Sequence, residues 1–201
     1  MDPISSTLFS LIFIIIIVGL IEKFYHKKSL KNIPIRIHVN GARGKSSVTR
    51  LIASGLRAGN LKTYAKTTGT TPRIIDDKGQ DIVIQRLRSA SIGEQIKLLR
   101  YFSKKNPDAL VMECMAVNPQ YQWISEHKIV QSTLGVITNV RPDHLDEMGS
   151  TNKEIAFSLS NTIPFNSVTI TSEKENIAPF QTISKKRNTV LQVSDCSDIP
   201  T

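Results

Sequence analysis

Hydrophobic residues are distributed along the chain in two different patterns. From residue 4 to residue 21 nearly every side chain is apolar, and Ile14 to Ile17 are four consecutive isoleucines. About 18 apolar residues are just enough for a helix that spans a bilayer. Beyond residue 32, short apolar runs alternate with stretches of helical periodicity, which is typical of an α/β domain. The pattern predicts an apolar N-terminal helix followed by one α/β domain.

The residues on either side of the apolar run indicate how that helix is used. A cleaved signal peptide has basic residues before the run and a small-residue cleavage site after it, but here Asp2 precedes the run and no such site follows. The residues that do follow are basic, namely Lys23, His26, Lys27, Lys28, Lys31 and Arg36. The positive-inside rule then places the N-terminus outside and everything after Glu22 in the cytoplasm.

We therefore predict two parts of the chain. Residues 1–31 form an uncleaved single-pass anchor in the cell membrane with a basic juxtamembrane segment, and residues 32–201 form the cytoplasmic catalytic domain. A core helix of a soluble protein is the alternative for the first part, but such a helix rarely lacks a polar face.

The apolar runs also predict the elements of the domain. Strands are expected over residues 33–39, 62–67, 109–113, 133–139, 167–171 and 189–193. Three helices are expected. The first covers residues 45–58 and is ended by Gly59. The second begins at the capping-box spacing of Ser91 and Glu94 and ends before Asn106, and the third begins at Thr151 and Glu154. The expected fold class is α/β with a mostly parallel sheet, and no internal repeat interrupts it.

A glycine-rich segment between the first strand and the first helix predicts a phosphate-binding loop. Gly41 and Gly44 let main-chain N–H groups approach an anion, and the helix N-terminus adds its positive dipole end. Lys45 would reach the outer phosphates, and Ser46 would hold Mg²⁺. The usual G-x-x-x-x-G-K-[ST] pattern has Val39 in place of its first glycine, whereas the shorter G-x-x-G-K-[ST]-[ST] form fits. An ordinary turn that caps a helix is the alternative.

Two further groups of polar residues follow buried strands. Glu113 closes one apolar run, and Asp143, His144 and Asp146 follow Asn139 at the end of another. Parallel sheets bind ligands at the carboxyl ends of their strands, and carboxylate oxygens are ligands that Mg²⁺ prefers. These residues are therefore candidates for a cation and its phosphates. The alternatives are a strand-end glutamate facing solvent and a polar loop with a helix cap.

Charge and cysteine content narrow the function classes. The net charge of +9 would suggest nucleic acid as a partner, but much of the excess is local to the juxtamembrane segment and to residues 185–187. No zinc-ligand spacing or aromatic–basic pattern accompanies it, so we expect no nucleic-acid partner. Cys114 and Cys196 form no C-x-x-C motif, which disfavours a disulfide or a zinc site and agrees with a cytoplasmic domain. Cys114 is expected to be a small core side chain.

Taken together, the motifs resemble the Mur ligase superfamily, which carries G-T-x-G-K-[ST], a strand-end Glu and T-N-[IV]-x-x-D-H-L-D in this order. The chain resembles more closely still the membrane-anchored ligase subunits of poly-γ-glutamate synthases, over nearly its whole length. The similarity lies in the anchor, in the form N-G-x-R-G-K-[ST]-[ST], and in the segments Thr68–Arg73, Glu113–Val117 and Asn139–His144.

This resemblance implies an ATP-dependent amide ligase of poly-γ-glutamate capsule synthesis. Such enzymes transfer the ATP γ-phosphoryl group to a carboxylate, and an amine then attacks the acyl phosphate. ATP and Mg²⁺ are the implied cofactors. The implied nucleotide-binding residues are Asn40, Gly41, Arg43, Gly44, Lys45, Ser46, Ser47 and Asn139. The implied catalytic residues are Lys45, Glu113 and His144, and the implied metal ligands are Ser46, Glu113 and His144.

The resemblance also implies partners: glutamate, poly-γ-glutamate, the membrane and other capsule synthase subunits. Thr70 and Arg73 are implied to bind the acidic substrate, because a guanidinium group suits carboxylates. Pairing of Arg73 with a nearby acid is an equal alternative. Arg86 and Arg88 are candidates for the path of the polymer, and a solvated basic face explains them as well.

Two departures from the family limit the inference. Where many Mur ligases have a carbamylated lysine, this chain has Ser158 or Leu159, which argues against an ordinary peptidoglycan ligase. Family members also continue well beyond residue 201, so we expect a fragment, a truncated product or one piece of a split enzyme. The alternative function is a membrane-tethered ATP-binding subunit that regulates capsule assembly without ligation.

Overall fold

The computed structural model describes residues 3–69, 71–85 and 92–195. Within these residues, the strands form one sheet in the order β4-β3-β2-β5-β1-β6-β7-β8. The strands are β1 (Ile35–Asn40), β2 (Thr63–Thr67), β3 (Arg73–Ile75), β4 (Asp81–Val83), β5 (Ala109–Glu113), β6 (Leu134–Ile137), β7 (Val168–Thr171) and β8 (Val190–Val193). All neighbouring strands from β2 to β8 pair in parallel, and β3 and β4 add an antiparallel hairpin at one edge.

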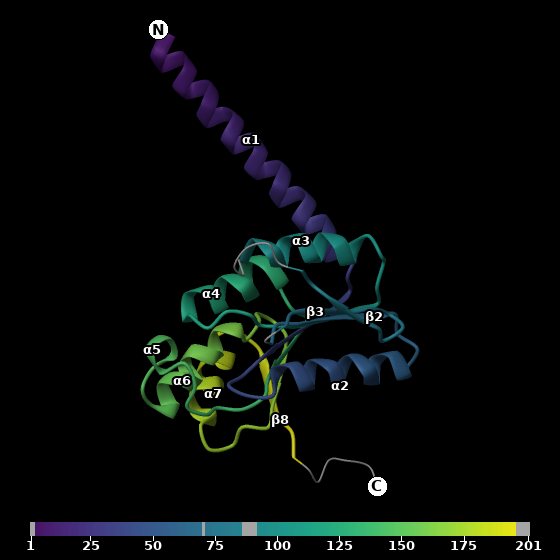
Figure 1. Ribbon diagram of the computed structural model, residues 1–201. Coiled ribbons are helices and arrows are strands. Elements are labelled where there is room, and N and C mark those ends of the chain that lie inside the picture. The colour runs from purple at the N-terminus through teal and green to yellow at the C-terminus, as the bar shows by residue number, and fades with distance from the viewer. Residues whose placement is uncertain (1–2, 70, 86–91, 196–201) are drawn as a thin grey trace.

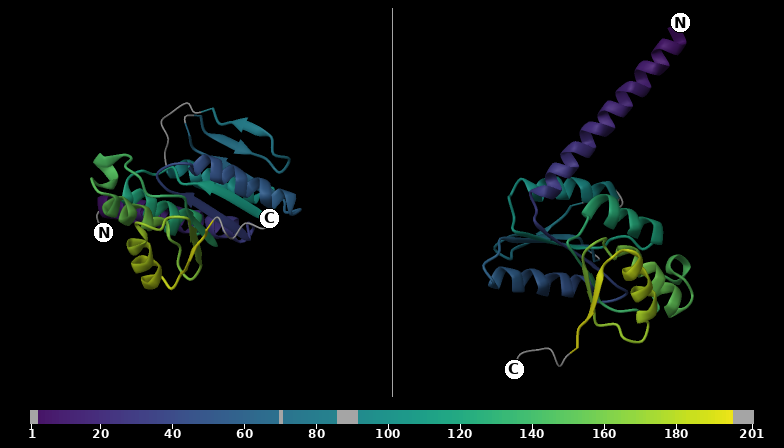
Figure 2. Two further views of the ribbon diagram at one scale, coloured as in Figure 1. Left: turned by 90° about the horizontal axis from the view of Figure 1, so that it is seen from below. Right: turned by 180° about the vertical axis from the view of Figure 1, so that it is seen from behind.

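Helices cover both faces of this sheet and one helix leaves the body (Figures 1 and 2). The helices are α1 (Pro3–Lys31), α2 (Lys45–Ala58), α3 (Ile92–Ser103), α4 (Pro119–Ile124), the π-helical turn η1 (Ser125–Val130), α5 (Leu145–Met148), α6 (Asn152–Leu159), the 3₁₀ turn η2 (Ser160–Thr162) and α7 (Ile177–Lys186). Helix α2 lies on one face, while α3, α4, α6 and α7 lie on the other.

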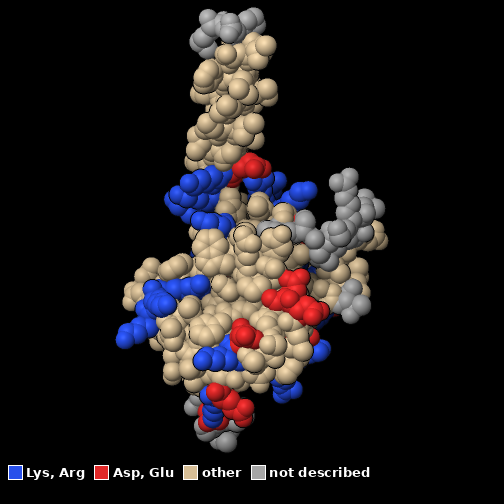
Figure 3. Space-filling model, turned by 90° about the vertical axis from the view of Figure 1, so that its left-hand side faces the viewer, with Lys and Arg blue, Asp and Glu red and all other residues tan. Residues whose placement is uncertain are grey.

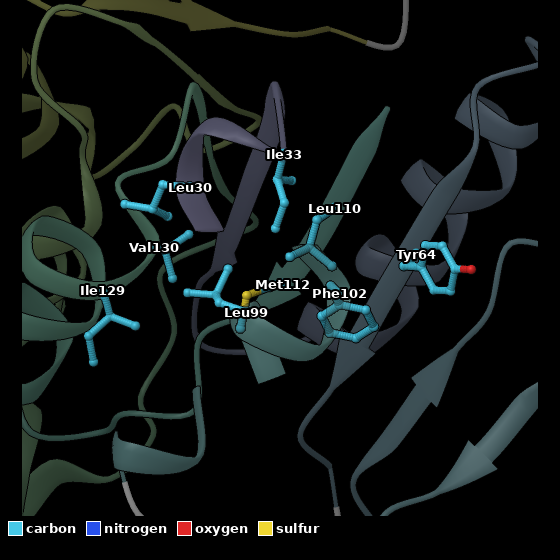
Figure 4. Packing of buried hydrophobic residues seen from close by; sticks show 9 residues of the cluster. All are labelled: Leu30, Ile33, Tyr64, Leu99, Phe102, Leu110, Met112, Ile129 and Val130. Atoms are coloured by element: carbon cyan, nitrogen blue, oxygen red, sulfur yellow. The ribbon is translucent and has the colours of Figure 1, made fainter. Parts of the chain in front are cut away.

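Side chains of the central strands alternate between two cores. On β5, Leu110 and Met112 pack in a cluster with Leu99 and Phe102 of α3, whereas Val111 packs in the cluster on the α2 face (Figure 4). This alternation follows from the two-residue period of a strand. Because β5 is buried on both faces, it presents its carboxyl end rigidly to the site described below.

The end of α1 belongs to the globular part. Leu30 and Ile33 are buried in the same cluster as Leu99 (Figure 4). The guanidinium group of Arg36 donates hydrogen bonds to the carbonyl oxygens of Leu30 and Ile33, at 3.1 and 2.6 Å, and to that of Gln131, at 2.8 Å. These contacts hold the end of α1, the start of β1 and the segment after η1 together.

The rest of α1 projects away from the body (Figure 1). Among the described residues it is the one helix long and apolar enough to cross a membrane, with a candidate span over Ile4–Lys31 and a mean hydropathy of 2.7 in its apolar window. None of that window is buried. By length and composition, α1 therefore meets the requirements of a membrane span.

The structure confirms the predicted α/β class and most of the predicted elements. Each predicted strand is present with ends shifted by no more than two residues, and the first predicted helix matches α2. Thr151 and Glu154 form the predicted capping box at α6. Ser91 lies outside the described residues. The hairpin β3–β4 and the helices α4 and α7 were not predicted.

Candidate functional site

The loop between β1 and α2 depends on two glycines. Gly41 has φ +137°, and a Cβ there would lie 2.0 Å from Thr138 Oγ1 and 2.9 Å from the Thr138 main-chain nitrogen. Gly44 has φ +79° and caps α2, and nothing lies within 4 Å of the place a Cβ would take. The loop thus packs tightly on one side and leaves open space at the N-terminus of a helix, where an anion is favoured.

The segment after β6 fixes this loop. Asn139 accepts a hydrogen bond at Oδ1 from the Arg43 main-chain nitrogen at 3.1 Å, and its Nδ2 donates to the Arg43 carbonyl oxygen at 3.0 Å. Thr138 Oγ1 donates to the same carbonyl at 2.7 Å. The structure therefore brings together Asn139 and Arg43, two of the predicted nucleotide-binding residues. The Asn139 side chain stabilises the conformation of the loop through these hydrogen bonds.

Lys45, at the start of α2, folds back over the loop. Its Nζ donates to the carbonyl oxygens of Gly41 at 2.8 Å and Ala42 at 3.3 Å. Ser47 is exposed in the first turn of the same helix. The ammonium group and the helix N-terminus thus place positive charge on the same side of the loop.

Ser46 and Glu113 meet where β1 and β5 end. Ser46 Oγ donates to Glu113 Oε2 at 2.8 Å, and the Thr68 main-chain nitrogen donates to the same oxygen at 2.8 Å. Glu113 is 3% exposed, so it does not simply face solvent. A carboxylate and a hydroxyl are oxygen donors of the kind that Mg²⁺ prefers, and this pair fits that ion.

Within the described residues, His144 makes no hydrogen bond or ion pair with Ser46 or Glu113. His144 adopts φ +47° just before α5, its side chain is 53% exposed, and its Nε2 lies 3.9 Å from Asp143 Oδ1. Asp143 also pairs with Arg43 at 3.3 Å. Among the described residues, no group of three or more His, Cys, Asp or Glu side chains is arranged to hold a metal. His144 as a third ligand remains a prediction.

Asn40 points into the core rather than into the loop. It is 2% exposed, and its Nδ2 donates to Gln122 Oε1 at 2.8 Å and Thr162 Oγ1 at 3.2 Å. These contacts connect the last residue of β1 to the helices on the face opposite α2. Asn40 therefore positions the start of the loop, and any direct contact with a nucleotide stays a prediction.

The predicted substrate residues have different outcomes. Arg73 Nη1 lies 3.5 Å from Asp81 Oδ2, and Arg50 donates to the same carboxyl group at 2.9 Å. The pairing of Arg73 with a nearby acid is thus present, and its role in substrate binding stays a prediction. Thr70, Arg86 and Arg88 lie outside the described residues.

Two buried polar residues near the site were not singled out from the sequence. Lys66 is fully buried near the end of β2, with its Nζ 3.9 Å from Glu94 Oε1. Glu173 accepts at Oε2 from the Val140 main-chain nitrogen at 2.9 Å, just after the Asn139 segment. Lys66 lies in a run of buried β-strand residues, where an alternating pattern alone predicts an apolar side chain.

A buried ion pair lies on the strand that leads to the loop. His38 Nδ1 is 2.7 Å from Glu126 Oε2, and the two side chains are 0% and 1% exposed. Ser132 donates to Glu126 Oε1 from its main-chain nitrogen and its hydroxyl. Burial acts to lower the pKa of His38, but Cys114 and Glu126 raise that pKa to about 10. Burial acts to raise the pKa of Glu126, but its contact with His38 lowers that pKa overall.

A groove runs beside the loop on the α2 face. It has a volume of about 640 Å³ and reaches from Gly44 and Asn139 along the apolar side chains of α2 and β6. Because α2 is the one described helix on this face, the sheet beyond β1 is left open there. The open groove begins where the loop leaves space for an anion.

The comparison with known proteins agrees with this geometry. The model of the Mur ligase middle domain matches residues 39–197, which include the loop, Glu113 and the Asn139 segment. The chain belongs to the Mur ligase family. A "Capsule biosynthesis protein CapB" of Bacillus anthracis is 43% identical over 188 residues, covering 92% of this chain and 40% of that protein. A "PGA synthase CapB" of Bacillus subtilis is 39% identical, covering 92% of this chain and 48% of that protein.

A solved structure shares the Mur ligase fold at low sequence identity. The bifunctional folylpolyglutamate synthase/dihydrofolate synthase of Yersinia pestis, complexed with AMPPNP and a Mn ion, superposes with a TM-score of 0.67 at 18% identity. The match covers 87% of this chain and 47% of that one. The chain thus spans less than half the length of each of these relatives.

Proposed function

We propose that this chain is the nucleotide-binding part of an ATP-dependent amide ligase that makes poly-γ-glutamate for a capsule. The observation that carries the proposal is the convergence of Ser46, Glu113 and the Thr68 main chain beside the Gly41–Lys45 loop. The names and the 43% and 39% identities of the two CapB relatives support the capsule polymer as the product. The AMPPNP and Mn ion in the folylpolyglutamate synthase support ATP and a divalent metal.

The reaction takes place in two steps. A glutamate carboxylate oxygen attacks the γ-phosphorus of ATP, the bond to the bridging oxygen breaks, and ADP leaves. An amine nitrogen then attacks the carbonyl carbon of the acyl phosphate, phosphate leaves with the bonding electrons, and the nitrogen loses a proton as the amide forms. Phosphoryl transfer needs positioning and charge stabilisation more than covalent help from the protein.

The residues of this chain divide those tasks. Lys45 and the N-terminus of α2 stabilise the charge that develops on the phosphates. Ser46 and Glu113 would hold Mg²⁺, with His144 proposed as a further ligand, and the ion would supply positive charge beside the phosphates. Arg73 lies on the strand β3 and is proposed, with Thr70, to bind the acidic substrate by exchanging its pairing with Asp81 for a substrate carboxylate.

Membrane attachment is part of the proposal. We assign α1 as a single-pass anchor with residues 1–31, and place the domain of residues 32–201 in the cytoplasm, because the exposed apolar part of α1 is followed by a lysine-rich end of the same helix. Other capsule synthase subunits are the expected partners at the membrane. Nucleic acid is not an expected partner.

The test is phosphate release by the full chain in neutral detergent micelles with Mg-ATP, with and without glutamate or poly-γ-glutamate. Lys45→Ala is the loss variant, and Lys186→Ala, at the far end of α7, is the matched control. Stimulation by glutamate that is lost only in Lys45→Ala is expected. Absence of Mg-ATP binding in the unchanged chain would overturn the proposal.

A second candidate function, ATP binding that regulates capsule assembly without ligation, would use the same loop, where Lys45 Nζ lies against the carbonyl oxygens of Gly41 and Ala42. Mg-ATP binding that depends on Lys45, without phosphate release under any substrate condition, would select this function over the ligase.

A further inference from the structure

A basic cavity lies where α1 enters the globular part. It has a volume of about 420 Å³ and opens between the last turns of α1 and the end of α3. Its charged lining is Lys28, Arg100 and Lys104, and Tyr25, Ser29 and Asn32 contribute hydroxyl and amide groups. None of these residues belongs to the nucleotide site.

The charges of this cavity are poorly neutralised by the protein. Within the described residues, neither Lys28 nor Lys104 forms an ion pair, and Arg100 has one long contact, 3.9 Å from its Nη2 to Glu22 Oε1. Arg100 Nε is buried and lacks a hydrogen-bond partner. A buried donor without a partner is costly, so the cavity favours an anionic ligand with several acceptor oxygens.

The position of the cavity relative to the apolar helix indicates the source of that anion. Tyr25 lies four residues and Lys28 seven residues beyond Ile21, which is about 6 and 10 Å along a helix. The headgroup layer on each side of a bilayer is roughly 5 to 8 Å thick. With α1 inserted as proposed and Ile21 at the edge of the hydrocarbon core, Tyr25 therefore lies within the headgroup layer and Lys28 just beyond it, so the rim of the cavity faces the lipid headgroups.

The surface above the cavity is suited to acyl chains. Figure 3 shows the Lys and Arg side chains gathered around the base of α1, with an uncharged surface along the helix above them. Tyr25 lies three residues before Lys28, and Ile21 lies four residues before Tyr25, so the three side chains share one side of the helix. Tyr25 is 56% exposed and Ile21 is 49% exposed. A free phosphate would use the cavity alone, whereas a phospholipid would use both surfaces.

We propose that this cavity binds the phosphate headgroup of an anionic phospholipid. Lys28 and Lys104 pair with the phosphate oxygens, Arg100 donates hydrogen bonds from its guanidinium group, and the acyl chains lie along α1. Binding of a lipid here clamps α1 against α3 and fixes the tilt of the body relative to the membrane. The proposal rests on the membrane insertion of α1 and is independent of the ligase activity.

The experiment counts lipids retained by the full chain in native mass spectrometry. The protein in neutral detergent is incubated with equal amounts of phosphatidylglycerol and phosphatidylcholine of the same acyl chains. We expect one retained phosphatidylglycerol, with occupancy at least ten-fold lower in the double variant Lys28→Ala/Lys104→Ala. The matched control is Lys23→Ala/Lys27→Ala, which removes the same charge from the same region but not from the cavity, and it keeps the lipid.

Competition experiments distinguish the possible sources of the anion, and a flotation experiment tests the proposed membrane anchor separately from the lipid site. Excess inorganic phosphate should not displace the lipid; displacement would assign the cavity to a free phosphate. Displacement by poly-γ-glutamate would assign it to the polymer. If both double variants lost the retained lipid equally, binding would come from general electrostatic attraction to the basic segment, and the proposed lipid site would be overturned. Flotation with phosphatidylcholine vesicles tests insertion of α1 separately, since it does not depend on the cavity.

Discussion

The buried pair of His38 and Glu126 allows a sharp test of the electrostatics of the domain. The perturbation is Glu126→Gln, which keeps the shape of the side chain and keeps an oxygen for the hydrogen bonds from Ser132. It removes the negative charge that faces His38 at 2.7 Å. A buried imidazolium without its carboxylate is unfavourable, so His38 is expected to become neutral in this variant.

Two estimates of the effect agree in size. Breaking a buried ion pair by removing one partner costs about 3 to 5 kcal/mol. The net rise of the His38 pKa from 6.5 to about 10, which includes the opposing effect of burial, corresponds to roughly 5 kcal/mol at 1.36 kcal/mol for each unit. We therefore expect Glu126→Gln to lower the free energy of unfolding by about 3 kcal/mol at pH 6.

The pH dependence has a defined sign. Because the pKa of His38 is raised on folding, its contribution is fully present below pH 6.5 and is lost as the pH rises toward about 10. Because the pKa of Glu126 is lowered, its contribution is present above pH 4.5 and is lost as the pH falls further. The pair should thus stabilise the unchanged chain most between about pH 4.5 and 6.5. Above pH 6.5 the free energy of unfolding of the unchanged chain should fall with rising pH, and in Glu126→Gln most of this fall should be absent.

The assay is urea unfolding in neutral detergent micelles between pH 5.5 and 9.5, followed by the fluorescence of Trp123, which is the single tryptophan of the chain. Glu175→Gln, at an exposed position, is the control and should change stability by less than about 0.5 kcal/mol. The double variant with Cys114→Ala gives the share of the thiol. The reasoning is refuted if Glu126→Gln leaves the slope above pH 6.5 unchanged, or if it costs no more than Glu175→Gln.

Three further predictions concern the loop, the metal site and a helix cap. Gly41→Ala should weaken Mg-ATP binding more than ten-fold in calorimetry, because its Cβ would lie 2.0 Å from Thr138 Oγ1; unchanged affinity would contradict the tight packing. Glu113→Gln should weaken binding of Mg-ATP far more than binding of metal-free ATP, and equal losses would remove its metal role. Thr151→Ala should lower the free energy of unfolding by about 1 kcal/mol by removing the N-cap hydrogen bond, and no change in urea unfolding would argue against that capping box.

The loop and the contact between Ser46 and Glu113 were predictable because the residues that form them lie in short sequence segments. Gly41, Gly44 and Lys45 are neighbours in the sequence, and a buried apolar run placed Glu113 at the carboxyl end of a strand. Parallel pairing then brings the ends of β1 and β5 together, since Val39 and Glu113 are in register. The sequence pattern alone was therefore enough to expect Ser46 and Glu113 near one another.

Other features depend on contacts between distant segments. Asn40 meets Gln122 and Thr162 only after three elements have packed, so no local pattern predicts that its amide group is buried. Strands β3 and β4 have three residues each, too few for alternation to be recognised. The one local signal for that hairpin was the turn at Asp76, whose carboxylate accepts hydrogen bonds from the main-chain nitrogens two and four residues on.

The short connection between α1 and the phosphate-binding loop has a geometric consequence. Only residues 32–34 separate the helix from β1, and β1 ends at Asn40, where the loop begins. Six residues of strand extend about 20 Å. The strand therefore limits the distance between the foot of α1 and the loop to about 20 Å. If α1 is inserted as proposed, a nucleotide bound at the loop therefore stays within about this distance of the membrane, however the body is tilted.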